Sequence, residues 1–142
     1  MLLGGCAGLA ACAAAPIADT SGYTVTGDAI PEPLAGAAGD PQRGREVVVS
    51  RDANCLLCHS LPETGQRFMG NVGPTLSGVG QRLSAGQIRL RVVDYTRVKP
   101  DVAMPPYYRV RALDNVAEPY RGKPVLTAQQ VEDVVAYLSS LR

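Results

Sequence analysis

Apolar side chains recur at helical spacing near the carboxyl end of the chain. Thr127-Ala128-Gln129-Gln130 has the capping-box pattern, in which the Thr and Gln side chains satisfy free backbone N–H groups at the start of a helix. An apolar stripe follows at Val131, Val134, Val135, Leu138 and Leu141. This spacing turns one face toward a core, so it predicts a helix from about 128 to 141.

A second capping box occurs in the middle of the chain. Ser84-Ala85-Gly86-Gln87 is followed by apolar residues at Ile88, Val92 and Val93. The combination predicts a helix from about 85 to 94.

A third helix is predicted where a polar linker gives way to apolar positions. Asp40 is a good N-cap residue, and Pro41 suits the first helical position because its missing N–H would be unpaired there. Val47 and Val48 continue the pattern, so we expect a helix from about 41 to 53. Gly44 within it permits close approach by another helix.

The intervening segments contain several Gly and Pro residues and no convincing strand run. A chain of 142 residues has room for one domain. We therefore expect one all-α domain, spanning residues 40–142 and built from three to four helices.

The first 18 residues carry no charge and consist largely of Ala and Gly. They are too short and too weakly apolar for a membrane span and are typical of an export leader. Leu9-Ala10-Ala11-Cys12 matches a bacterial lipobox, Cys6 lies in a poorer match, and a plain signal peptide explains the segment equally well. Each interpretation predicts a periplasmic protein. Residues 19–39, which are polar and Pro/Gly-rich without periodicity, are predicted to form a flexible linker.

Charge and composition narrow the classes of function. The formal net charge is +1, so the total favours neither nucleic acid nor an anionic membrane as a partner. With six Tyr, one Phe and no Trp, a core of mostly Val, Leu and Ala would be well filled by a large prosthetic group. Between Arg82 and Lys123, nine basic residues face four acidic ones, which fits either a basic docking surface or a solvated face.

The segment Asn54-Cys55-Leu56-Leu57-Cys58-His59 contains C-x-x-C-H, the pattern of covalent haem attachment. Two thiols one short turn apart can add to the two vinyl groups on one edge of a porphyrin, and the next residue then lies under the iron. Cys55 and Cys58 are therefore candidate thioether sites for one haem c. His59 is the candidate proximal iron ligand.

Two other interpretations of this motif are weaker. A structural zinc site needs four ligands, whereas residues after the leader offer only Cys55, Cys58 and His59. A thioredoxin-like dithiol needs a surrounding βαβ pattern, which is missing here.

His59 is the only His, so a second axial ligand from the same chain cannot be His. Met is the leading candidate. Met104 lies before Pro105 and Pro106, which stiffen the backbone and suit a rigid loop that presents one sulfur. Met69, in a Gly-rich loop, is the alternative ligand or packs along the haem edge.

Gly73-Pro74 follows His59 at a distance from which a loop can return to the proximal side. A ligating His nearly always donates its other ring N–H to an acceptor. We assign this role to the Pro74 carbonyl, although Gly73-Pro74 is also explained as a simple turn.

Several motifs, taken in order, resemble those of class I cytochromes c over about residues 40–142. They are Cys55-x-x-Cys58-His59, Gly73-Pro74-x-Leu76, Met104-Pro105 and the terminal Val131–Leu138 pattern. More narrowly, the chain resembles the SoxX family, the monohaem subunits of SoxXA complexes in bacterial thiosulfate oxidation. The motifs behind this narrower resemblance are Gly70–Pro74, Leu90–Asp94, Met104–Tyr108 and Gly122–Thr127.

The resemblance implies a cytochrome c fold around one covalent haem, with His59 and Met104 as axial ligands of low-spin iron. It also implies a SoxA-like cytochrome partner that holds the thiosulfate-coupling site, and a further redox-partner cytochrome that accepts the electrons. The chain would then be non-catalytic alone, as the electron-transfer subunit of a heterodimeric L-cysteine S-thiosulfotransferase. Residues 107–123 are where partner contacts are expected.

Two other functions stay open at this point. One is a free or membrane-tethered cytochrome that carries electrons to a different respiratory partner. The other is a ligand-binding haem protein, which requires Met104 to be absent from the iron or easily displaced.

Overall fold

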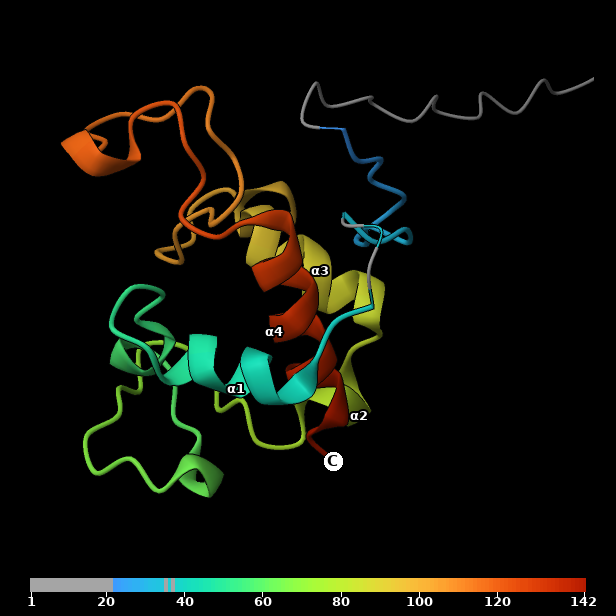
Figure 1. Ribbon diagram of the computed structural model, residues 1–142, viewed down its shortest axis with the longest axis vertical. Coiled ribbons are helices and arrows are strands. Elements are labelled where there is room, and N and C mark those ends of the chain that lie inside the picture. The colour runs from blue at the N-terminus through green and yellow to red at the C-terminus, as the bar shows by residue number, and fades with distance from the viewer. Residues whose placement is uncertain (1–21, 35, 37) are drawn as a thin grey trace, which may run out of the picture.

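The computed structural model describes residues 22–34, 36 and 38–142, and Figure 1 shows their arrangement. Its α-helices are α1 (Pro41–Val49), α2 (Val79–Arg82), α3 (Ala85–Asp94) and α4 (Ala128–Ser140), and short 3₁₀ turns occur at Cys55–Leu57, Pro62–Thr64, Tyr95–Arg97 and Glu118–Tyr120. Thr26 and Ala29 form an isolated antiparallel bridge, and the described residues form no extended strand. The predicted all-α class, with three to four helices, is confirmed.

The predicted leader, residues 1–18 with Cys6 and Cys12, lies outside the described residues. Among the residues that are described, no helix combines the length and the apolar character needed to cross a membrane.

The two capping boxes form as predicted. The Ser84 and Thr127 hydroxyls accept hydrogen bonds from the Gln87 and Gln130 backbone N–H groups, at 3.3 and 3.2 Å. In each box the Gln side-chain oxygen in turn accepts a hydrogen bond from the backbone N–H of the cap residue, at 2.9 Å in both cases. The capping-box signal lies within four consecutive residues, so both helices begin where predicted. α3 also ends at the predicted residue, and α4 ends one residue earlier than predicted, at Ser140.

α1 ends earlier than predicted. Asp40 caps its start by accepting from the N–H groups of Gln42 and Arg43, at 2.8 and 3.0 Å, but the helix stops at Val49 and not near residue 53. The Ser50 hydroxyl donates to the Val47 carbonyl at 2.8 Å and accepts from the Ala53 N–H at 3.2 Å. Such local Ser bonds compete with helix continuation and turn the chain toward the cysteine motif.

α4 packs against both α1 and α3 and forms the centre of the core (Figure 1). Gly44 is where α1 crosses α4, and a Cβ there would overlap the Asp133 carbonyl. The predicted close approach at Gly44 is therefore present. The largest fully buried apolar side chains are Ile30, Val48, Leu61, Leu90, Val93 and Val131.

Residues 22–34 differ from the flexible linker that their composition predicts. Ile30 is completely buried, and its N–H donates to the Gly86 carbonyl of α3 at 3.0 Å. This segment has irregular backbone, so its buried positions follow no period that a sequence pattern could reveal.

A buried carboxylate fastens the crossing of α1 and α4. Asp133 accepts from the Asp40 backbone N–H at 2.8 Å and from two nitrogens of Arg43 at 2.9 Å each. The Arg43 guanidinium and these hydrogen bonds lower the pKa of Asp133 from 3.8 to about 2. Because the folded-state pKa lies below the unfolded one, this stabilisation is complete above about pH 4 and is lost as pH falls toward 2.

We expect Asp133→Asn to lower the free energy of unfolding by about 1–2 kcal/mol at pH 7. The expected loss is no larger because Arg43 is half-exposed and solvent screens its interaction with Asp133. The substitution should also flatten the decline in stability between about pH 4 and 2, as measured by urea unfolding. Glu118→Gln, which breaks the exposed pair with Arg121, is the matched control and should change neither quantity. An unchanged acid limb in Asp133→Asn would refute this assignment.

Candidate haem site

The cysteine motif folds as a tight helical turn. Cys55–Leu57 is a 3₁₀ turn, and the Cys55 carbonyl accepts from the N–H groups of Cys58 and His59 at 3.2 and 3.0 Å. These bonds bring Cys55, Cys58 and the His59 ring to one side of the turn. Both thiols are free and partly buried, as an attachment site for a prosthetic group requires.

The predicted contact between His59 and Pro74 is present. The Gly73 N–H donates to the Cys58 carbonyl at 2.8 Å, and the Leu76 N–H donates to the Ser60 carbonyl at 2.9 Å, which fixes the returning loop. His59 Nδ1 then lies 2.7 Å from the Pro74 carbonyl oxygen. A carbonyl can only accept, so Nδ1 carries the proton and Nε2 keeps its lone pair for a metal.

Gly73 is required by this geometry. A Cβ at Gly73 would overlap the His59 imidazole, so only glycine lets the loop pass this close to the ring.

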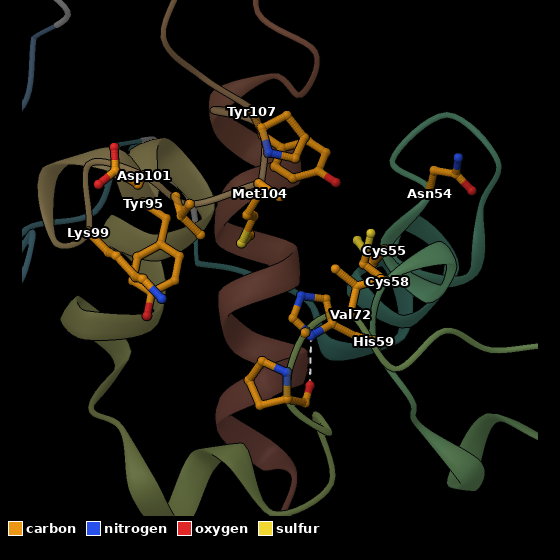
Figure 2. A pocket seen from close by; sticks show the side chains of 15 residues that line it. Asn54, Cys55, Cys58, His59, Val72, Tyr95, Lys99, Asp101, Met104 and Tyr107 are labelled. Carbon is orange, nitrogen blue, oxygen red and sulfur yellow. Dashed lines mark hydrogen bonds between the residues drawn. The ribbon is translucent and has the colours of Figure 1, made fainter.

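Figure 2 shows the cavity that these residues line. The sulfurs of Cys55 and Cys58 lie toward one end, Tyr95 and Lys99 lie at the opposite end, and His59 and Met104 enter between them. A second, smaller cavity shares Cys55, His59, Met104 and Tyr107 with the first, and its other lining side chains are apolar: Val48, Leu76, Val92, Leu126, Val134 and Leu138. A flat, largely apolar group with a polar edge matches this lining.

The two candidate methionines are separated by their surroundings. Met104 lines the cavity together with His59, and Figure 2 shows its sulfur directed inward. The Met69 sulfur instead accepts a hydrogen bond from the Leu61 backbone N–H at 3.1 Å. Met104 is therefore placed to be an axial ligand, whereas Met69 ties its own loop to Leu61.

Comparison with known proteins decides the family. The family model for cytochrome c matches residues 41–142, which is most of the chain. The chain belongs to the cytochrome c family. A search of curated proteins found no match.

One solved structure extends this result. The crystal structure of SoxXA from P. pantotrophus is similar to this cytochrome at 32% sequence identity and a TM-score of 0.74. The match covers 80% of this chain and 90% of that chain. The predicted class I c-type cytochrome and its resemblance to SoxX are confirmed.

The family implies a covalently bound haem c, and the cytochrome's own residues fit it. Two free thiols lie at one edge of the cavity, and an imidazole with its Nδ1 proton engaged leaves Nε2 available. The Met104 thioether enters the same space, which has an apolar inner wall. Met with His is the ligand pair that suits haem iron in this class of protein.

Tyr107 joins the two sides of the cavity, a role that the sequence analysis missed. Its hydroxyl donates to the Ala53 carbonyl at 2.6 Å, linking the segment that follows Met104 to the segment that precedes Cys55. Burial raises the pKa of the Tyr107 hydroxyl and raises the pKa of the Cys55 thiol to about 11. Tyr107 therefore keeps its proton at neutral pH, as its hydrogen bond to the Ala53 carbonyl requires.

Three contacts hold the chain that leaves Met104. The N–H groups of Tyr107 and Tyr108 donate to the Val92 and Val93 carbonyls at the end of α3, at 3.2 and 3.3 Å. The Arg109 guanidinium donates to the fully buried Asp94 carboxylate at 3.1 Å. The Arg109 charge is therefore compensated by Asp94 within the fold, and Arg109 is a poorer candidate for contact with a partner protein.

Several other basic residues between Arg82 and Lys123 are also paired with acidic residues, so fewer of them are free to contact a partner than the sequence indicates. Arg89 is buried against Glu132 at 2.8 Å, and Arg91 pairs with Asp28 at 3.3 Å. Arg121 pairs with Glu118 at 2.7 Å. These pairs favour the solvated or structural interpretation for a large part of that charge.

Proposed function

We propose that this cytochrome is the SoxX-like, single-haem electron-transfer subunit of a periplasmic SoxXA-type complex that oxidises thiosulfate. Electron transfer follows from the cytochrome c family itself. The observation that carries the finer proposal is the structural likeness to SoxXA, which extends over 80% of the chain. The uncharged leader, with Cys12 as its candidate lipid anchor, is the basis for proposing export.

The cavity residues supply binding and closure. Cys55 and Cys58 would hold the prosthetic group covalently, and the Pro74 carbonyl, which engages His59 Nδ1, would leave Nε2 free to bind the iron. When bound, haem c supplies reversible one-electron chemistry at its iron. His59 and Met104 line the same cavity and would both ligate the iron of such a group, which would leave no iron position for substrate. A Met ligand also raises the reduction potential.

The end of the cavity away from the cysteines is suited to carboxylates. In a haem, the two propionate groups lie on the edge opposite the vinyl groups. Tyr95, Lys99 and Asp101 lie at that end (Figure 2), and among the described residues no carboxylate, that of Asp101 included, forms an ion pair with the Lys99 ammonium, which is therefore the cation available to a propionate. We therefore assign Lys99 and Tyr95 to the propionate edge.

We place the partner on an exposed apolar surface, formed by Leu57, Phe68 and Val72, beside the cysteine turn. Their exposed fractions are 66%, 91% and 73%. The Gly70 N–H donates to the Leu56 carbonyl at 2.8 Å, which holds the 68–72 loop against the turn, and Val72 also lines the cavity. A SoxA-like subunit seated here would shorten the path for the electron, since it would lie directly beside the thioether edge.

Co-purification with a SoxA-type subunit tests the proposal. We expect a stable complex with the wild-type chain, and a loss of affinity of about tenfold or more when Leu57 and Phe68, which do not line the cavity, are both replaced by Ser, because the interface then buries less apolar area. The absorption spectrum should not change. Tyr120→Ser is the control, because Tyr120 lies in the other candidate docking region, residues 107–123, and is 37% exposed.

The outcomes separate the open alternatives. Loss of the complex in Tyr120→Ser but not in the double variant would move the docking surface to residues 107–123. Failure of the wild-type chain to bind any SoxA-type subunit would contradict the SoxX-like role and favour an independent electron shuttle.

A further inference from the structure

Residues 22–34, here called the strap, pack against the helical part of the domain through the buried side chains of Tyr23 and Ile30. Ile30 is completely buried, and a Cβ on Gly86 of α3 would lie only 3.0 Å from the Ile30 carbonyl oxygen. The Arg89 guanidinium donates to that same carbonyl at 2.7 Å. The strap therefore lies against the helix that leads to the Met104 loop.

A buried ion pair holds the carboxyl end of the strap, at Leu34. Arg89 and Glu132 pair at 2.8 Å, with 6% and 4% of their side chains exposed. Glu132 also accepts the Leu34 N–H at 2.9 Å. Two charges buried at this depth need additional hydrogen bonds, and backbone groups of the strap supply part of them.

The amino end of the strap, at Tyr23, contacts the segment that follows Met104. Tyr23 is 6% exposed, and its ring lies against Tyr108 with centroids 6.4 Å apart and planes at 55°. Tyr108 is tied in turn to the Val93 carbonyl. Between Met104 and Tyr107, Pro105 and Pro106 restrict the backbone, which limits how far this short segment can absorb a shift of Tyr107 or Tyr108.

We propose that the strap is a brace that keeps Met104 on the haem iron, with Tyr23 as its positioning residue. This inference rests on the proposed role of Met104 as an axial ligand. Without the Tyr23 ring, Tyr108 loses one of the surfaces that hold it. The Met104 loop should then leave the iron more readily, although the thioethers and His59 keep the haem in place.

Imidazole titration of the oxidised, full-length protein tests the brace, because imidazole competes with Met104 for the iron. Tyr23→Ala should raise the apparent imidazole affinity by about threefold to tenfold, the range expected from losing one aromatic pair. The weak red charge-transfer band of iron–Met coordination should disappear at correspondingly lower imidazole. Tyr23→Phe keeps the ring and should retain most of the wild-type resistance.

Tyr137→Leu is the control for a general loss of stability, because Tyr137 is buried on α4 beside Gly44, where α4 packs against α1. It should lower the free energy of unfolding without changing imidazole affinity. If Tyr23→Ala does not accumulate, Tyr23→Leu removes the ring while retaining apolar volume, and the same rise is expected.

The results distinguish two failures. A normal wild-type charge-transfer band, together with unchanged imidazole affinity in the Tyr23 variants, would overturn the brace alone. Absence of that band in the wild type would overturn the Met104 assignment and the brace with it.

Discussion

Replacing both Cys55 and Cys58 with Ala is expected to abolish retention of haem by the denatured chain. Each thiol is expected to supply one of the two thioether bonds, and unfolding removes every non-covalent contact. Haem staining after denaturing electrophoresis measures the result directly. Each single replacement should leave one bond and give weaker but detectable staining.

The other two cysteines provide the matched control for this experiment. Replacing Cys6 and Cys12 by Ala removes the same number of thiols from the leader, so haem staining should be unchanged. Full staining of the Cys55/Cys58 double variant would contradict covalent attachment at this motif.

Met104→Ala is expected to open the sixth coordination position while leaving haem covalently attached. The ferric spectrum should become high-spin, or change to that of a substitute ligand, and the red charge-transfer band should vanish. The reduction potential should fall by on the order of a hundred millivolts, since axial ligands dominate haem potentials. Visible absorption and redox titration measure these changes.

Met69→Ala is the control that tests ligand identity. Its sulfur accepts the Leu61 N–H, so its loss should lower stability and leave the spectrum unchanged. The reverse pattern, with spectral change in Met69→Ala alone, would make Met69 the ligand. Cyanide or carbon monoxide binding by the wild type as tight as in Met104→Ala would favour a ligand-binding haem protein.

The parts of this fold that could be predicted from sequence are those with local signals. The capping boxes at Ser84 and Thr127 set the starts of α3 and α4 through bonds within one turn. The contact from His59 to Pro74 was predictable because a ligating imidazole needs an acceptor, and Gly73-Pro74 lies where a loop can return.

The features that sequence analysis missed depend on contacts between distant segments. Ile30 lies 56 positions before Gly86 in the chain, and the strap's buried residues follow no regular period. Tyr107 acts through the Ala53 carbonyl, a backbone group that no side-chain motif reveals. Arg89 and Arg109 contribute to a basic excess in the sequence, but the fold pairs them with buried acids.

The pyridine haemochrome spectrum of the purified full-length protein, combined with mass spectrometry of the peptide that spans Asn54–His59, shows directly whether haem c is attached at this motif. We expect one haem per chain, a spectrum in which both vinyl groups are saturated, and thioether bonds at Cys55 and Cys58. A haem with free vinyl groups, or an unmodified Asn54–His59 peptide in the haem-loaded protein, would contradict this attachment.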